Sequence, residues 1–359
     1  MSSERIPPRV RHWLFHVVTV VLLLVAALGL LSLLLVLTGH PVVPALSALV
    51  RGAFGSYYAI TSATLVRMVP LALAGLAVAV AFRAGILNIG AEGQLLMGAA
   101  AATAVSGVMT GVPSLVAIPA LLVVGSLAGG AWAAIAGALR LRFGVLEVIS
   151  TIMLNFIALY VTGWLVRGPL QEPTRINPQS VSLPTALQLP VLLPGTRLHA
   201  GVLLTVIVAA VLWWWLRTTA SGFRLRAVGA NPLAAASAGR IAVPRTLFGA
   251  FALSGVLAGL AGATEYTGIT YALYENFSPG YGYTAIAVAL LARLHPLGVL
   301  ATATLFGALQ AGANAMQRDA GVPNVVVSVV EAMLILLVVA ADRWREHTSQ
   351  QRVPAESSA

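Results

Sequence analysis

The sequence predicts an all-α membrane protein that crosses the bilayer about ten times, with both termini in the cytoplasm. Hydrophobic residues make up 59% of the 359 residues and charged residues only 9%, against about 25% charged residues in soluble domains. The apolar residues form runs of about 20, enough for a helix to cross a hydrocarbon core roughly 30 Å thick. All 21 basic residues are arginines, and this topology puts most of them in the cytoplasm, as the positive-inside rule requires.

Several other classes of protein are disfavoured by what the sequence lacks. Without lysine it has no phosphate-binding GxxxxGK[ST] loop. It also lacks cysteine, HExxH and GxSxG, which argues against an intramembrane enzyme. The arginines are scattered between apolar runs rather than forming one stripe, so we expect no nucleic-acid binding. His12 and His16 have no third ligand nearby in sequence, and no metal site is expected.

The chain divides into three predicted parts. Residues 1–60 hold a first span and an outer interfacial segment, 61–342 form the core, and 343–359 are a polar cytoplasmic tail. The proline-rich stretch 168–196 is expected to be an outer loop.

GxxxG spacing in two core spans, at Gly125 and Gly129 and at Gly255 and Gly259, predicts close helix packing. The predicted spans are 13–37, 62–82, 113–139, 145–166, 198–216, 247–266, 296–313 and 323–341, with two more beginning near residues 94 and 283.

Polar side chains recur within these apolar spans. Such groups are costly in a membrane unless they face protein or water, so they are candidates for a translocation path. A polar helix start at the membrane surface, or packing against a neighbouring helix, would also account for them. Glu147, Thr151 and Asn155 follow one another at i,i+4 spacing and share a helix face. The candidate path residues are Asn88, Glu92, Gln94, Glu147, Thr151, Asn155, Tyr283 and Glu331.

Two glycine-broken polar stretches precede alanine-rich helices. Gly282 and Tyr283 align with Gly93 and Gln94, and the predicted topology puts the first stretch at the inner face and the second at the outer face. Such an arrangement is typical of an inverted-topology repeat.

The basic stretch 217–245 must lie outside the bilayer. Within it, Asn231 can cap a helix whose first turn holds Pro232, and Gly239 can end that helix. A short surface helix between two spans is either a docking element for a partner protein or an ordinary cytoplasmic loop.

Four stretches in this order resemble the permease subunits of ATP-binding-cassette (ABC) importers for nucleosides, within the wider group that serves simple sugars and branched-chain amino acids. They are FRAGILNIGAEGQLLMGA (82–99), EVISTIMLNFIALY (147–160), GFRLRAVGANPLAAASAGR (222–240) and LLARLHPLGVL (290–300). The resemblance covers about residues 60–342.

The resemblance implies a multi-pass subunit of the bacterial cell membrane that binds no cofactor itself. Its implied partners are two ATPase subunits or domains carrying ATP and Mg, a second permease subunit, homologous or identical, and an extracytoplasmic substrate-binding lipoprotein. It also implies a coupling helix at 222–240 that meets the ATPase, with Gly222, Arg226, Gly229, Asn231, Pro232 and Gly239 as the matching positions.

Two alternatives remain open at the level of sequence. The first is the same type of importer acting on simple sugars. The second is an ion-coupled secondary transporter, in which Glu92, Glu147, Glu265 and Glu331 would be proton sites.

Overall fold

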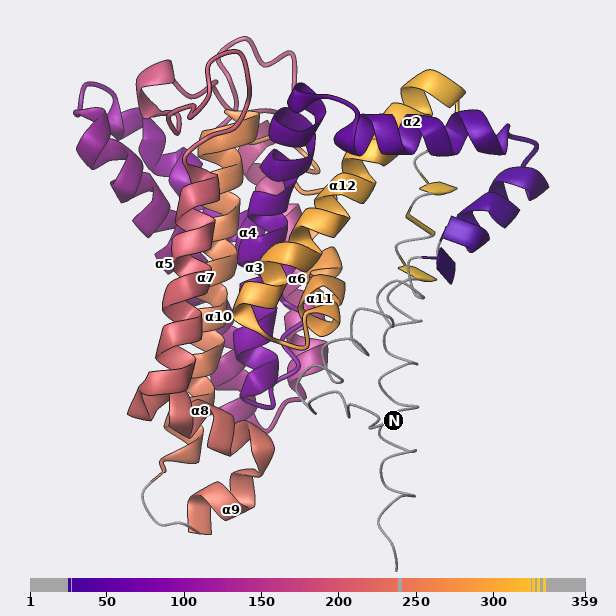
Figure 1. Cartoon of the computed structure of the whole chain (residues 1–359). Coiled ribbons are helices and arrows are strands. Elements are labelled where there is room, and N and C mark those ends of the chain that lie inside the picture. The colour runs from indigo at the N-terminus through magenta and orange to yellow at the C-terminus, as the bar shows by residue number, and fades with distance from the viewer. Residues whose placement is uncertain are drawn as a thin grey trace, which may run out of the picture. The chain divides into compact units, whose positions relative to one another are not determined.

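The computed structural model describes residues 25–26, 28–237, 241–323, 325–326, 328–329 and 332–333. Every regular element in these ranges is a helix (Figure 1). Strand-like pairing among the described residues is limited to isolated bridges in loops. The predicted all-α class is therefore confirmed for this part of the chain.

Six of the described helices are long and apolar enough to cross a membrane. They coincide with the predicted spans that begin at residues 62, 113, 145, 198, 247 and 296. Most of the predicted spans 13–37 and 323–341 lies outside the described residues. The six are Ala59–Arg83, which includes α3 (Leu65–Arg83), α5 (Ser114–Phe143), α6 (Glu147–Arg167), α7 (Gly201–Thr218), Val243–Thr270, which includes α10 (Val243–Glu265), and α12 (Pro296–Ala320).

Two shorter helices replace the spans predicted after residues 94 and 283. They are α4 (Ala91–Ser106), with 16 residues, and α11 (Tyr281–Leu291), with 11 residues. At about 1.5 Å per residue, α11 is only about 16 Å long, roughly half of the hydrocarbon thickness. The prediction of a full span after residue 283 is therefore wrong.

The described residues fall into two compact units. One is Ala53–Ala311, and the other joins residues up to Gly52 with those from Gly312 onward. In the latter unit, Leu49 of α2 (Val42–Phe54) packs against Gly312 of α12. The domain boundaries predicted after residues 60 and 342 remain predictions. All the site residues described below lie in the unit Ala53–Ala311.

Glycines bring three helices of this unit into backbone contact. Helix α10 packs most extensively against α5, and α4 packs against both. A Cβ atom at Gly259 would collide with the carbonyl oxygen of Gly125, and one at Gly129 would collide with that of Gly255. The close packing predicted from the GxxxG spacing is confirmed. Helix–helix association in lipid depends on such close approach, because apolar burial contributes little there.

The proline-rich loop 168–196 is held against the segment that follows α10. Backbone N–H groups of the loop donate to carbonyl oxygens of that segment: Ser180 to Leu273 at 2.7 Å, Leu183 to Tyr271 at 2.6 Å and Leu189 to Thr267 at 2.9 Å.

Next to this loop, burial and, to a smaller extent, Arg197 lower the pKa of His199 to about 4. The imidazole is therefore neutral at physiological pH.

Substituting Gly259 by leucine should disrupt the contact between α5 and α10. The side chain has no room at the Gly125 carbonyl, and overpacking of this kind costs about 1–3 kcal/mol or more. We expect a lower thermal unfolding temperature and a lower yield of monodisperse protein. The matched control is Gly249→Leu on the same helix, where a Cβ atom meets nothing within 4 Å. Equal stability of the two variants would contradict this account of the packing.

Candidate functional site

Helices α4 and α11 begin beside each other inside the protein. The backbone N–H of Gly282 donates to Oε2 of Glu92 at 2.7 Å, and a Cβ atom at Gly282 would collide with the backbone of Glu92. The two glycine-broken stretches therefore meet, and their predicted placement at opposite membrane faces is wrong.

The two helices run in opposite directions from this junction. Helix α4 ends near Tyr266, whose hydroxyl lies 3.0 Å from Ser106. Helix α11 packs along α3 and ends where the Leu294 carbonyl meets the last residue of α3, Arg83. The pair thus has the form of two half-helices with their N-termini together, an arrangement that transporters use to build sites within the membrane.

Glu92 lies at the start of α4 and accepts a hydrogen bond from the start of α11. It lies in the first turn of α4 and is only 7% exposed. Its carboxylate accepts from Gly282 at the start of α11 and also bonds the Ser278 side chain. Helix N-termini carry unpaired N–H groups and a partial positive charge, so a carboxylate between two of them is stabilised electrostatically.

Asn88 ties the chain before α4 to α4 and to α10. Its side chain exchanges two hydrogen bonds with Gln94, at 3.1 and 3.2 Å, and donates to Ser254 of α10 at 2.9 Å. Its Oδ1 also accepts from the backbone N–H of Gly90. Ser254 in turn donates to the Ala77 carbonyl of α3. The predicted polar mouth is thus a buried hydrogen-bond network.

Asn155 of α6 fastens that helix to the start of α4. Its Oδ1 accepts from Gly93 N–H at 2.9 Å, and its Nδ2 donates to the Ile89 carbonyl at 2.9 Å and to the Tyr283 hydroxyl at 3.3 Å. Thr151 lies one turn away and packs against Gly90. Asn155 therefore bonds α4, the segment before it and α11.

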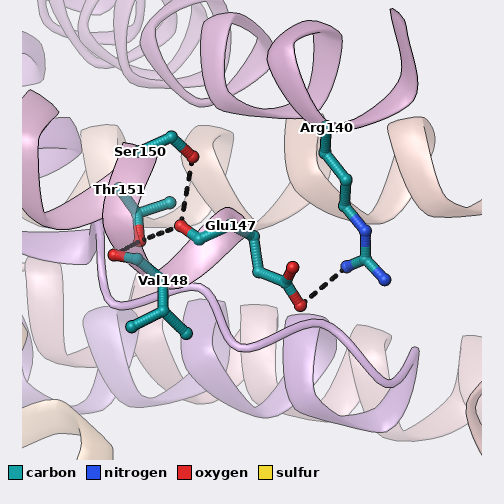
Figure 2. A network of polar contacts seen from close by, with 5 residues as sticks. All are labelled: Arg140, Glu147, Val148, Ser150 and Thr151. Carbon is teal, nitrogen blue, oxygen red and sulfur yellow. Dashed lines mark hydrogen bonds and ion pairs between the residues drawn. The ribbon is translucent and has the colours of Figure 1, made fainter. Parts of the chain in front are cut away.

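Glu147 lies at the start of α6 and pairs with Arg140 at the end of α5, with Nη1 and Oε1 2.9 Å apart (Figure 2). Its backbone carbonyl accepts hydrogen bonds from the hydroxyls of Ser150 and Thr151. Both hydroxyls are therefore used inside α6. The carboxylate bridges the turn between two helices instead of joining the buried network.

Among the described candidates, Tyr283 has the most exposed side chain. It is 43% exposed, and its hydroxyl bonds Asn155. The remaining candidate, Glu331, lies outside the described residues. The described residues contain no group of three or more His, Asp or Glu side chains able to hold a metal ion.

The basic stretch forms two short helices, α8 (Ala220–Ala230) and α9 (Pro232–Ser237). Asn231 Oδ1 accepts from the N–H groups of Leu233 and Ala234, both at 3.0 Å. The predicted helix with an Asn231 cap and Pro232 in its first turn is confirmed. Gly239, its predicted end, lies outside the described residues. Arg226 is exposed on α8.

Two glycines of α8 allow it to pack directly against the ends of α7 and α3. A Cβ atom at Gly222 would collide with the Trp215 carbonyl of α7, and one at Gly229 would collide with the Arg83 carbonyl of α3. These positions of the basic stretch are thus explained by close backbone contact, which sequence reasoning had not assigned to them.

Arg83 links this contact to α11, and sequence analysis missed it. Its Nε donates to the Leu294 carbonyl at 2.8 Å. Arg293 and Leu294 have φ values of 51° and 57°, a left-handed conformation that costs non-glycine residues about 1–3 kcal/mol. Burial, then Arg83 and Arg217, lowers the pKa of nearby His295 below its usual value. This shift favours the neutral imidazole beside Arg83.

Residues 60–339 match the family described as branched-chain amino acid transport system / permease component. The chain belongs to this family. It is a membrane-spanning permease subunit of an ABC importer, and the resemblance found in its sequence is confirmed. A permease component carries out transport rather than catalysis, so the alternatives of an intramembrane enzyme and of a lone ion-coupled transporter are set aside.

Similar proteins cover most of the permease. The guanosine ABC transporter permease NupP of Bacillus subtilis strain 168 is 38% identical over 92% of this chain and 94% of its own. The glucose ABC transporter permease TsgB13 of Haloferax volcanii is 35% identical over 92% and 88%. The nucleoside ABC transporter permease NupB of Lactococcus lactis is 33% identical over 77% and 78%. No solved structure matches the chain.

Replacing Asn155 by leucine should destabilise the permease. The change leaves Gly93 N–H and the Ile89 carbonyl without the partners they now have, and an unsatisfied buried group costs about 1–3 kcal/mol. We expect a lower unfolding temperature of the purified protein. The control is Ile157→Leu, at an exposed position of the same helix, which should behave as wild type. An unfolding temperature unchanged by Asn155→Leu would show that these hydrogen bonds do not hold α6 in place.

Proposed function

We propose that the permease carries nucleosides into the cytoplasm. The observation that carries the proposal is the similarity to NupP, a guanosine permease, over nearly the full length of both chains. The nucleoside permease NupB adds support. The runner-up is a simple sugar, favoured by the similarity to the glucose permease TsgB13 over a comparable share of the chain.

The path that we propose passes the junction of α4 and α11. Tyr283 is the residue assigned to substrate contact, because its ring is partly exposed and its hydroxyl is held by Asn155. An aromatic ring with an oriented hydroxyl suits a nucleoside, which offers a flat base for stacking and ribose hydroxyls for hydrogen bonding. Five other candidates act around Tyr283 by holding the helix starts in place: Asn88, Glu92, Gln94, Thr151 and Asn155. Glu147 fixes the start of α6 to the end of α5. Glu331 stays a candidate for the path on its sequence alone.

The ATPase docks, in this proposal, on the surface formed by α8 and α9. This surface carries the exposed Arg226 and the capped α9, and α8 contacts the ends of α3 and α7. ATP and Mg are bound by two ATPase subunits or domains.

A second permease subunit completes the membrane pore. An extracytoplasmic lipoprotein delivers substrate to the outer side, where we assign its contact to the loop 168–196. The subunit lies in the cell membrane with about ten membrane helices, counting the shorter α4 and α11, and with both termini in the cytoplasm.

The substrate can be tested by uptake in cells that lack the gene. We expect uptake of labelled guanosine to fall sharply, because the deletion removes the membrane path that the importer needs. Plasmid-borne wild-type permease should restore uptake. Glucose uptake is measured in parallel as the control. A loss confined to glucose would overturn the nucleoside proposal in favour of the sugar, and unchanged uptake of both would reject it outright.

Arg226→Glu should weaken recovery of the ATPase with tagged permease. It reverses one charge on the proposed docking surface, and charge reversal at a complementary interface is strongly unfavourable. Arg142→Glu is the matched control, since Arg142 is also exposed, in the last turn of α5 and apart from α8 and α9. Recovery reduced by Arg226→Glu alone supports the surface. Undiminished recovery and transport would remove Arg226 from it.

A further inference from the structure

A cavity of about 500 Å³ lies between the end of α7, α8 and the first half of α10, away from the α4 and α11 junction. Its lining combines Arg224, Arg245, Ser221 and Thr246 with the apolar residues Ala250 and Leu253. Along α10, Arg245 and Thr246 lie in the first turn and Ala250 and Leu253 follow one to two turns later, so the polar end lies at the start of α10. The cavity therefore changes from cationic to apolar along its length.

The two arginines are not neutralised by any residue that the structure describes. Neither side chain makes a hydrogen bond or an ion pair with any residue that the structure describes. None of the residues that line the cavity is acidic. Both arginines are exposed, and an anion placed between them would gain charge-assisted hydrogen bonds that no other described group supplies.

The length of the cavity indicates what kind of anion it holds. Along α10 its lining extends from Arg245 to Leu253, which is about 12 Å at 1.5 Å per residue. Its polar end adjoins Trp215, whose Nε1 donates to Ser221 at 2.8 Å, and tryptophan is enriched at the level of lipid headgroups. A soluble anion would pair with the arginines but would leave Ala250 and Leu253 uncovered.

We propose that this cavity binds one anionic phospholipid of the inner leaflet. The phosphate lies between Arg224 and Arg245, and an acyl chain follows α10 past Gly249 toward Leu253. The site is distinct from the transport path, and the proposal does not depend on which substrate the permease carries. A phospholipid here joins α7, α8 and α10 at the base of the coupling surface.

The test measures binding of phosphatidylglycerol to the purified, intact permease complex by native mass spectrometry, with phosphatidylcholine of the same acyl chains as the neutral reference. We expect wild type to prefer phosphatidylglycerol by about tenfold or more. Arg224→Gln with Arg245→Gln should abolish this preference. The same pair changed to lysine should keep most of it, because an ammonium still pairs with phosphate.

Two further variants separate the site from general charge effects. Gly249→Leu should lower phosphatidylglycerol binding with both arginines present, because its side chain enters the apolar part of the cavity. Arg142→Gln removes an exposed arginine at the end of α5 and should leave binding unchanged. Matching unfolding temperatures of the glutamine and lysine double variants would show that the loss is not caused by misfolding.

Three outcomes would overturn the proposal. The first is an unchanged preference in the glutamine double variant. The second is displacement of the lipid by inorganic phosphate at equal concentration, which would make the ligand a soluble phosphate. The third is loss of ATPase recovery in the double variant with lipid binding intact, which would assign the arginines to the partner protein instead.

Discussion

The structure depends on satisfying two helix N-termini that lie inside the protein. The first N–H groups of any helix lack partners within it, and the hydrocarbon core offers no water to replace them. Here Glu92 accepts from the start of α11, and Asn155 accepts from Gly93 in the first turn of α4. Together with Ser278, which accepts from Tyr281, these two side chains allow α4 and α11 to begin at one point within the bundle.

Close approach of backbones is the second requirement, and glycine meets it. Gly282 lies directly against the backbone of Glu92, and Gly93 lies against that of Asn155. The seam formed by α4, α5 and α10 extends the same principle, since Gly98 and Gly259 touch there. Larger side chains at these places would separate the donors from their acceptors. Packing and hydrogen bonding therefore depend on the same small residues.

Local features of the fold could be predicted from the sequence because their causes are local. Apolar runs predicted the six long helices, and Asn231 with Pro232 predicted the start of α9. Pairing between distant segments could not be predicted in this way. The bond from Gly282 to Glu92 joins residues 190 positions apart. The sequence after residue 283 predicts a full span because a short apolar helix followed by a turn has nearly the same composition as one long apolar helix. The sequence showed that Glu147, Thr151 and Asn155 share one face of α6. It did not show that Asn155 bonds Gly93, Ile89 and Tyr283.

The position of Arg83 gives the proposed coupling a continuous physical route. Gly229 of α8 rests on the Arg83 carbonyl, and the Arg83 side chain holds the Leu294 carbonyl at the end of α11. The other end of α11 is held by Glu92, so this short helix connects the proposed ATPase surface to the junction by one rigid element. A displacement of α8 against α3 would therefore act on the same residue that holds the end of α11. Because coupling free energies between sites are reciprocal, a change at the junction would equally alter how α8 meets its partner.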